Sequence, residues 1–465
     1  MPKGKKNGIT LLILFVVFVC AIVLYFLLPQ RETEKKEADS DLTEEETITV
    51  ENLAAEDITA IQIKRKGQDG LSLERKEGVW HLLDVPEASL EEERVTELLD
   101  SLNSVTASKA LEKNQAELSD YGLAKPAMTI EATTSDGTVH RYDLGAEVPV
   151  LGGYYGMASA KDKIYCFSEE FFAAFDIRGN SLLQVEELPQ IEKENMTFIQ
   201  VKNKKGDDFA AKRVAKKKRV NVDSPWNITK PYDKPLAAST SGWDTTLDYF
   251  SELAFHEMVA YHADNLAEYG LDSPASVVTV RGKEKKSLVL YIGKQDEDGF
   301  YYVKEKKSAH VYNMDAASIE NMTGIDAFSV MDTYVYNRDI TDINGFDVKG
   351  KKEQAISCKN SGDGENSKTI FTLNGQSVSE EEEAKLEDIY LSLTELTYTS
   401  RVKKSAMREK SDKPVLTVVF HEDGRDVTVK FLPYDGINFY IADKDGMDYF
   451  VVDKPKVDNI VEALK

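Results

Sequence analysis

Tyr121-Gly122-Leu123-Ala124-Lys125-Pro126 decides the fold of this chain, because the pattern returns 148 positions later as Tyr269-Gly270-Leu271-Asp272-Ser273-Pro274. The echo extends beyond these six residues. Two further pairs keep the spacing to within one position: Leu144-Gly145 recurs as Ile292-Gly293, and Tyr154-Tyr155 recurs as Tyr301-Tyr302. A period of this length indicates tandem copies of one structural unit.

The residue types of the repeated motif predict the end of a short helix and the start of a strand. Glycine adopts the left-handed conformation that closes a helix at little steric cost, and the leucine after it is placed for the apolar contact that accompanies such caps. A proline three residues after the leucine cannot continue a helix and favours an extended path. Contact with a ligand is the alternative to this structural role. The residues concerned are Tyr121, Gly122, Leu123 and Pro126, with Tyr269, Gly270, Leu271 and Pro274.

Alternating apolar residues around the motif predict several antiparallel strands in each copy. Trp80 and Trp226 begin equivalent strands, in Trp80-His81-Leu82 and Trp226-Asn227-Ile228, and are expected to be structural. A long helix is predicted at about 89–105, 243–255 and 379–396, and a short helix ends each copy. Ser-x-x-Glu capping boxes at Ser89 and Ser379 mark two of the helix starts. The predicted fold class is therefore α+β.

Three Asp-Gly pairs predict tight β-hairpins. They are Asp136-Gly137, Asp423-Gly424 and Asp445-Gly446, each between alternating apolar runs. A two-residue turn of the primed type requires positive φ at both central residues, and Asp-Gly is among the pairs that supply it most readily. We therefore predict that both residues of each pair have positive φ.

The length of 465 residues and the period together predict three repeats behind an N-terminal anchor. In the third copy Phe371-Thr372-Leu373 replaces the Trp-x-Leu pattern, Pro414 is kept and Tyr-Gly-Leu is lost. The predicted boundaries are 1–30 for a cytoplasmic tip and transmembrane anchor, 31–50 for a charged linker, 51–190 and 191–335 for the first two repeats, and 336–465 for the diverged third.

Ile9–Leu28 is apolar apart from one threonine. At about 1.5 Å per residue a helix of that length crosses the roughly 30 Å hydrocarbon core of a bilayer. Three lysines among the first six residues predict a cytoplasmic N-terminus and an exported remainder. A cleaved signal peptide and a lipoprotein modified at Cys20 are the alternatives, but the small residues that either cleavage needs are missing. An uncleaved single-pass anchor is predicted.

Composition restricts the function. A formal net charge of −23 excludes nucleic acid as a partner, because phosphates require a basic surface. Three cysteines are too few for a disulfide framework. Cys166 and Cys358 fall in different repeats and are expected to act as small apolar residues, with a pairing of the two as the alternative.

The chain contains no phosphate-binding loop of the Gly-x-x-x-x-Gly-Lys type and no Gly-x-Ser-x-Gly nucleophile elbow. His256-Glu257 followed by His262 resembles a zinc-protease helix, but such a site needs two histidines four positions apart. These histidines are interpreted as structural. We predict no catalytic, cofactor-binding or metal-binding residue.

One basic cluster interrupts the acidic sequence. It is interpreted as a solvated hairpin, with contact to anionic lipid headgroups or wall polymers as the functional alternative. The cluster consists of Lys212, Arg213, Lys216, Lys217, Lys218 and Arg219.

With these features placed, the chain resembles the bacterial family known as domain of unknown function DUF4340. The matching features are the single apolar N-terminal stretch, Trp80-x-Leu82, and Tyr121-Gly122-Leu123-x-x-Pro126 with its copy at Tyr269. The resemblance implies an envelope protein of a kind often encoded beside ABC-type transporters of the gliding-motility or multidrug-export class. It carries over no catalytic residue.

The expected function is that of a membrane-anchored, extracytoplasmic accessory or binding protein without enzymatic activity. The expected partners are the membrane, through a single pass, and ABC transporter subunits. A cell-envelope hydrolase acting on wall polymers and a purely structural spacer are the alternatives.

Overall fold

The computed structural model describes residues 47–68, 70–112, 118–149, 152–159, 162–221, 223–361, 368–403 and 413–465. The predicted anchor Ile9–Leu28 and most of the predicted linker lie outside these residues. Within the described part, no helix is both long enough and apolar enough to cross a bilayer.

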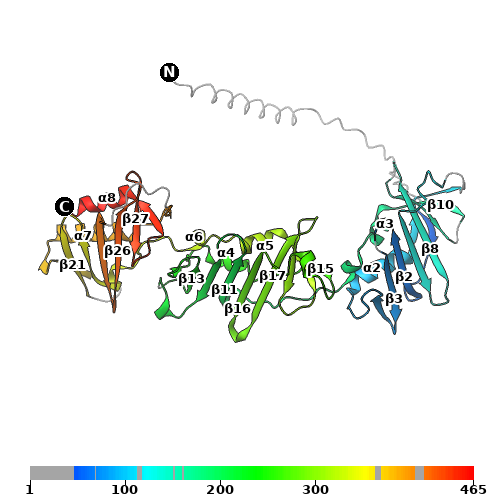
Figure 1. Ribbon diagram of the computed structural model, residues 1–465, viewed down its shortest axis with the longest axis horizontal. Coiled ribbons are helices and arrows are strands. Elements are labelled where there is room, and N and C mark those ends of the chain that lie inside the picture. Colours follow the sequence, from blue (N-terminus) through cyan, green and yellow to red (C-terminus); the bar gives the residue numbers. More distant parts are fainter. Residues whose placement is uncertain are drawn as a thin grey trace, which may run out of the picture. The chain divides into compact units, whose positions relative to one another are not determined.

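The first large sheet is antiparallel and has eight strands (Figure 1). A two-stranded ladder between β1 (Ile48–Glu51) and β5 (Val105–Ala107) accompanies it. From edge to edge the sheet runs β4 (Val79–Leu82), β3 (Leu71–Lys76), β2 (Ile58–Arg65), β7 (Met128–Thr134), β8 (Val139–Glu147), β9 (Tyr154–Ala158), β10 (Lys163–Phe167) and β6 (Lys109–Glu112).

The second and third sheets have nine strands each and repeat the strand order of the first, with one added strand at the β4-type edge. The second runs β14 (Leu236–Ala237), β13 (Trp226–Lys230), β12 (Phe209–Arg213), β11 (Met196–Asn203), β16 (Ser276–Gly282), β17 (Ser287–Gln295), β18 (Tyr301–Glu305), β19 (Val311–Met314) and β15 (Glu257–Ala260). The third runs β23 (Gln376–Ser377), β22 (Lys368–Leu373), β21 (Glu353–Ser361), β20 (Ile343–Lys349), β25 (Leu416–Glu422), β26 (Arg425–Pro433), β27 (Phe439–Lys444), β28 (Phe450–Asp453) and β24 (Ser400–Arg401).

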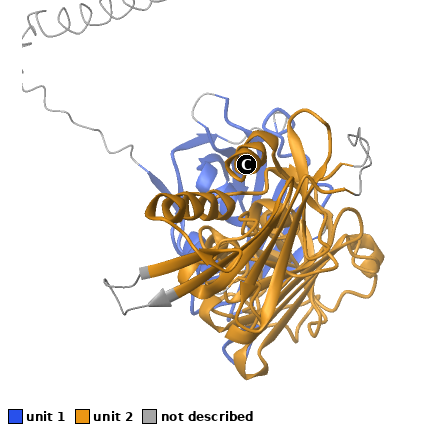
Figure 2. Cartoon of the chain, turned by 90° about the vertical axis from the view of Figure 1, so that its left-hand side faces the viewer, with its two compact units in different colours: residues 1–80, 93–177 blue, residues 81–92, 178–465 orange. Residues whose placement is uncertain are grey.

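Two compact units divide the chain (Figure 2). The first comprises residues up to 80 together with 93–177, and the second comprises 81–92 together with 178–465. The second and third sheets therefore belong to the same compact unit.

The predicted α+β class, with one long and one short helix in each repeat, is wrong, because strands dominate the described residues. The α-helices there are α2 (Glu92–Asn103), α3 (Glu169–Phe175), α4 (Trp243–Asp248), α5 (Ala316–Thr323), α6 (Ala327–Val330), α7 (Glu380–Thr394) and α8 (Lys454–Ala463). The long helix predicted at 243–255 is the six-residue α4. It contains two adjacent β-branched threonines, which lower helix propensity, and no side chain caps its first turn.

The two predicted capping boxes have different outcomes. At Ser379 the prediction is confirmed: its hydroxyl accepts the N–H of Glu382 at 3.4 Å, and the Glu382 carboxylate accepts the N–H of Ser379 at 2.9 Å. At Ser89 it is wrong, because the Ser89 carbonyl accepts the N–H of Gln184 at 2.9 Å. The adjoining bridge between Leu90 and Leu183 keeps this segment extended, and α2 begins only at Glu92.

The three predicted Asp-Gly turns also have different outcomes. Asp445-Gly446 has φ of 53° and 78°, which confirms the primed turn. At Asp136-Gly137 and Asp423-Gly424 only the glycine has positive φ, so the prediction is wrong there. Asp136 instead accepts the backbone N–H of Thr138 at 2.9 Å, and the hydroxyl of Thr134 donates to it and lowers its pKa to about 2.

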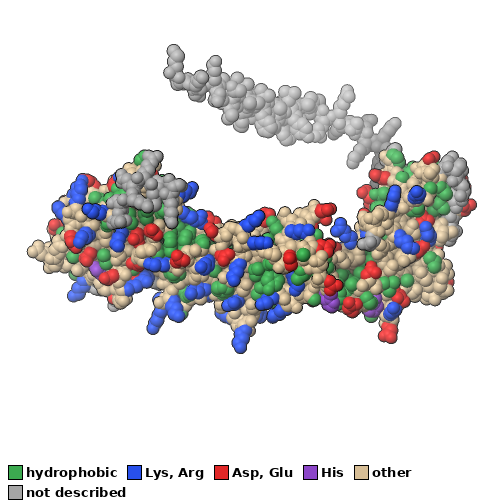
Figure 3. Space-filling model, viewed as in Figure 1, with side chains coloured by type: hydrophobic (Ala, Val, Ile, Leu, Met, Phe, Trp, Pro, Cys, Tyr) green, Lys and Arg blue, Asp and Glu red, His purple; other side chains and the backbone are tan. Residues whose placement is uncertain are grey.

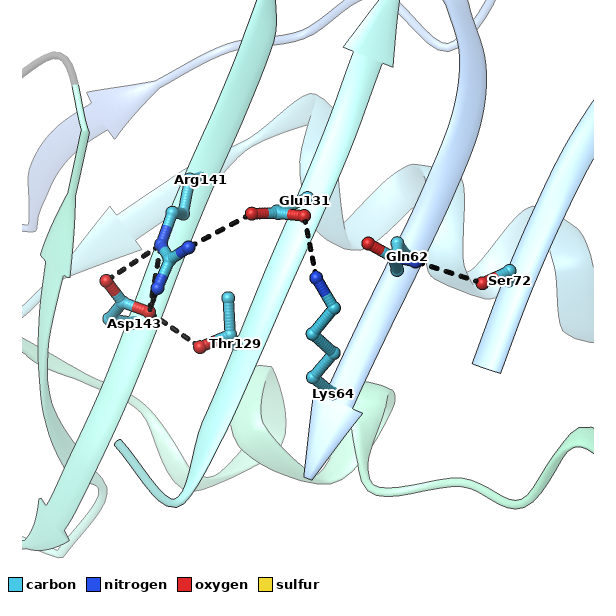
Figure 4. A network of polar contacts seen from close by, with 7 residues as sticks. All are labelled: Gln62, Lys64, Ser72, Thr129, Glu131, Arg141 and Asp143. Atoms are coloured by element: carbon cyan, nitrogen blue, oxygen red, sulfur yellow. Dashed lines mark hydrogen bonds and ion pairs between the residues drawn. The ribbon is translucent and has the colours of Figure 1, made fainter. Parts of the chain in front are cut away.

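Side chains of the first sheet alternate between an apolar face and a polar face. On the apolar face, Ile61 and Ile63 are fully buried. Figure 4 shows the polar face, where Arg141 binds Asp143 at 2.8 Å and Glu131 at 3.1 Å. Because these side chains are exposed to solvent, their ion pairs contribute little to stability. We interpret the network as the solvated surface of the sheet.

Cys166 in β10 and Cys358 in β21 are free, buried thiols. Burial raises the pKa of the Cys358 thiol to about 12. A thiol with so high a pKa is a poor nucleophile at neutral pH.

Candidate functional site

The Tyr-Gly-Leu motif forms the same backbone structure in the first two repeats. Gly122 has φ of +71° and Gly270 has φ of +69°, both in the left-handed region. In the first repeat the N–H of Leu123 donates to the carbonyl of Leu118 at 2.8 Å, and in the second the N–H of Leu271 donates to Leu266 at 2.9 Å. In the second repeat Gly270 caps the 3-10 helix η5 (Leu266–Tyr269). Leu123 and Leu271 are buried, while Tyr121, Tyr269, Pro126 and Pro274 are partly buried.

The other repeated residues lie against this motif, which accounts for their common spacing. The carbonyl of Tyr121 accepts the N–H of Ala146 at 2.8 Å, and a Cβ at Gly145 would lie 2.2 Å from that carbonyl oxygen. The Tyr121 ring packs edge-on against Tyr155, with centroids 4.9 Å apart. The second repeat reproduces both contacts: a Cβ at Gly293 would lie 2.0 Å from the Tyr269 oxygen, and Tyr269 packs against Tyr302 at 5.2 Å.

The third repeat lacks both partners in this contact. Leu416 pairs with Phe431 as Met128 pairs with Leu144, so Leu432 occupies the position of Gly145. A leucine there would exclude a carbonyl held as close as that of Tyr121. The loss of Tyr-Gly-Leu and the loss of the facing glycine therefore occur together.

The basic cluster, which we call the basic loop, follows the second repeat's strand β12. Lys212 and Arg213 end that strand, and Lys216, Lys217 and Lys218 form the 3-10 helix η4 (Lys216–Lys218). Arg219 is half-buried and the other five side chains are exposed. Among the described residues, none of the four lysines forms a salt bridge with a carboxylate. Figure 3 shows how widely lysine and arginine side chains are otherwise mixed with acidic ones on the face that it draws.

Asn227 holds the basic loop in place. This side chain is only 3% exposed. Its Nδ2 donates to the carbonyl of Lys218 at 2.9 Å, and its Oδ1 accepts the N–H of Val220 at 3.2 Å. Its neighbour Trp226 is buried too, whereas Trp80 in the first repeat is only partly buried. The first residue of the Trp-x-Leu pattern therefore differs in burial between the repeats.

A cavity of about 200 Å³ adjoins the basic loop, and we call it the Trp cavity. It is built by η3 (Lys193–Asn195), the end of β12, the start of β13 and α4. Trp226 and Trp243 pack together in its wall, with ring centroids 5.5 Å apart. The lining residues are Lys193, Glu194, Arg213, Asp223, Ser224, Pro225, Trp226, Ser239, Thr240, Trp243, Asp244 and Leu247.

Trp243 in the wall of this cavity is 5% exposed. Its indole Nε1–H is buried out of reach of the cavity's contents and has no acceptor among the described residues. A larger cavity of about 330 Å³ lies between α7 and α8, and none of the residues with such an unpartnered atom lines it. Sequence reasoning marked Trp226 and Arg213 but missed Trp243, which it placed only at the start of a long helix.

The cations of the Trp cavity differ in how far they are already neutralised. Lys193 binds Asp248 at 2.9 Å and Asp244 at 3.5 Å, and the hydrogen bond that it donates to Asp248 raises the pKa of this lysine. Arg213 donates to a neutral acceptor, the carbonyl of Glu194, at 2.7 Å. The Arg213 guanidinium therefore retains donors and charge for a ligand.

The histidines that resemble a zinc-protease helix lie on either side of strand β15. His256 stacks on Phe300 at 4.5 Å, and His262 stacks on His310 at 4.9 Å. The N–H of His262 donates to Nδ1 of His310 at 3.1 Å, and burial lowers the pKa of His310. Within the described residues, no group of three or more metal-ligating side chains is brought together.

Comparison with known families gives a match over most of the chain. The model of a family described as domain of unknown function (DUF4340) matches residues 80–236 and again 226–414. The two matches begin at Trp80 and Trp226, the equivalent residues of the first two repeats. No curated protein and no solved structure matches the chain.

Proposed function

The chain belongs to the DUF4340 family, and on that premise we propose that it is an extracytoplasmic accessory and binding protein without a catalytic role. It would be held at the outer face of the cytoplasmic membrane by the apolar stretch Ile9–Leu28, with the N-terminus cytoplasmic. ABC transporter subunits are the protein partners that the family resemblance implies.

The basic loop is the observation that carries the binding role. Four lysines lie exposed beside one another with no carboxylate partner among the described residues, on a chain with a net charge of −23. Like charges held together in an ordered segment repel one another, so the arrangement favours an anionic partner. The buried Asn227 fixes that segment through the hydrogen bonds to Lys218 and Val220. Anionic lipid headgroups are the partner we propose, since a membrane-held protein meets them at high concentration.

We expect replacement of all four lysines by glutamine (Lys212, Lys216, Lys217 and Lys218) to weaken binding to vesicles with 30% anionic lipid by at least a hundredfold. Each lysine near such a surface contributes about 1 kcal/mol. Co-sedimentation of the full-length chain at low and high salt measures the effect, and the residual binding should lose its salt dependence.

The 3-10 helix η6 (Lys283–Lys285) and its C-cap Lys286 supply the control lysines on the same sheet. Replacing Lys283, Lys285 and Lys286 by glutamine should change binding less than threefold. If this control loses as much affinity, net charge alone explains the binding. If the chain binds soluble wall polymer and does not bind vesicles, the partner is the polymer.

The accessory role is tested in cells. Chemical cross-linking of the full-length chain in cells, followed by its purification, should capture transporter subunits from native membranes. Capture of no membrane protein would contradict the accessory role. Full function after exchange of the repeats for an unrelated module of equal length would select the structural spacer instead.

A further inference from the structure

We propose that the outward face of the second sheet binds helix α7 of a second copy of this chain. The inference goes beyond the membrane and transporter contacts proposed above and does not depend on them. It starts from the polar network that Figure 4 shows on the first sheet, because that network is missing from the equivalent face of the second sheet.

Strand pairing identifies the equivalent residues of the two faces. Strands β7 and β8 of the first sheet correspond to β16 and β17 of the second, with the displacement of 148 positions that the repeated motif has. The equivalent residues are Thr129 and Val277, Glu131 and Thr279, Arg141 and Val289, and Asp143 and Tyr291. The second face therefore lacks the two carboxylates and the guanidinium of the network, and has two valines and a tyrosine instead.

The three apolar residues of the second face keep part of their surface exposed. Val277, Val289 and Tyr291 are partly exposed, whereas Val278 and Leu290, which adjoin them in the strands, are fully buried. Side chains alternate between the two faces of a sheet, so the three lie together on the outward side. Val277 pairs with Tyr291, and Val289 lies diagonally opposite Val277. Together they form a small apolar patch.

A lysine beside this patch has lost its carboxylate partner. In the first sheet, Lys64 binds Glu131 at 3.4 Å. Its equivalent in the second sheet is Lys202, which is exposed and pairs with Val277 as Lys64 pairs with Thr129. The position of Glu131 is occupied by a threonine, and Lys202 forms no salt bridge within the described residues.

Two further cations lie beside Phe198 on the same face. Phe198 pairs with Lys212 in β12 and with Arg281 in β16, and the Arg281 guanidinium lies 4.9 Å from the centre of the Phe198 ring. Strands β11, β12, β16 and β17 contain no aspartate or glutamate. In a chain with a net charge of −23, this face therefore fits an anionic partner that also offers an apolar contact.

Helix α7 has the complementary character. Among the helices that the structure describes, α7 alone carries a large apolar side chain that is exposed, and this side chain, Leu391, is 51% exposed. Glu380 and Glu387 are exposed too, and neither forms a salt bridge within the described part of the chain. At 3.6 residues per turn, the two glutamates lie on the same side of the helix as Leu391. A helix laid on the second sheet thus places its leucine on the apolar patch and its carboxylates near the cations.

The geometry of the contact predicts its strength and its symmetry. One helix on one sheet face buries less area than the roughly 1,200–2,000 Å² of a stable complex, so we expect micromolar dissociation constants. The contact joins two different surfaces, and each bound copy keeps one of each free. Association therefore forms open chains of copies and not a closed dimer.

Sedimentation velocity of the full-length chain in detergent tests the contact, and the average mass should rise with concentration across the micromolar range. Lys202→Glu with Arg281→Glu should weaken association at least tenfold, and Glu380→Lys with Glu387→Lys should weaken it as much. Mixing the two double variants should restore association, because the acidic sheet face of one then meets the basic helix of the other. A defect in folding would not be restored by mixing.

The apolar patch is tested by giving the second sheet the residues of the first. The four changes are Val277→Thr, Thr279→Glu, Val289→Arg and Tyr291→Asp. The first sheet shows that this strand pairing accepts the network, so the variant should fold and should no longer associate. Lys64→Glu with Lys66→Glu, two exposed lysines of the first repeat, is the matched control and should associate as the parent does.

A single-copy mass at every concentration would overturn the proposal. Association that survives either double variant, or that mixing does not restore, would overturn it too. If the chain stays single and binds polyglutamate through Lys202 and Arg281, the face belongs to a different acidic partner. These measurements contain no anionic lipid, so they can fail while the vesicle binding of the basic loop holds.

Discussion

Replacing Gly293 by alanine is expected to destabilise the second repeat by about 3 kcal/mol or more. A Cβ at this position would lie 2.0 Å from the carbonyl oxygen of Tyr269 and 3.2 Å from the Leu271 side chain. The first obstacle is backbone that belongs to the capped turn at Gly270, so no rotamer change relieves it. The turn must move away from β17, and the packing of Tyr269 on Tyr302 is lost with it.

Thermal unfolding of the full-length chain measures this effect. Trp226 and Trp243 are both buried in the second repeat, so tryptophan fluorescence reports mainly on that repeat. The transition should fall by roughly 10 °C for a repeat of this size. Lys294→Ala is the control, since this neighbouring side chain in the same strand of the second repeat is exposed. Equal melting of Gly293→Ala and the parent would show that the repeated contact has no structural role.

Replacing Glu422 by glutamine is expected to destabilise the third repeat by about 3 kcal/mol. The Glu422 side chain is 9% exposed and accepts hydrogen bonds from Arg425 at 2.7 Å, Arg338 at 3.3 Å and the hydroxyl of Tyr336 at 3.2 Å. Glutamine keeps the shape but removes the charge. Arg338, whose side chain is 16% exposed, is then left as a largely buried cation without its carboxylate.

Urea unfolding followed by circular dichroism measures the loss as a lower midpoint for the third repeat. Glu353→Gln is the matched control on the same sheet. Its ion pair with Lys349, at 3.2 Å, joins side chains that are 71% and 67% exposed, so the change should cost less than 1 kcal/mol. Similar losses in the two variants would contradict the special role of Glu422.

The same cluster predicts how the stability of the third repeat depends on pH. Burial tends to raise the pKa of Glu422, but the hydrogen bond and charge of Arg425, with the charge of Arg338, outweigh it and hold the pKa below the ordinary value of 4.5. The ionised form is therefore favoured by folding. Its contribution is complete above pH 4.5 and is lost as the pH falls through the folded-state pKa. Acid titration of Glu422→Gln should show a shallower loss of stability below pH 4.5 than the parent.

Local features of the sequence determined some of the structure, where the interacting groups are close along the chain. The capping box at Ser379 and the primed turn at Asp445-Gly446 were predicted because each involves residues at most three positions apart. The same patterns failed at Ser89 and Asp136. In the first case a bridge to Leu183 overrides the local preference, and in the second hydrogen bonds with Thr134 and Thr138 select another turn.

The sequence by itself determined the period, the residues that mark it, the basic loop and the family to which the chain belongs. Only the tertiary structure explains the period. It places β8 against the turn, where a Cβ at Gly145 would lie 2.2 Å from the carbonyl oxygen of Tyr121. It also decided that strands dominate and that Trp243 lines a cavity beside Arg213. Pairings of this kind join residues tens of positions apart, and hydrophobic periodicity along a single strand or helix contains no information about them.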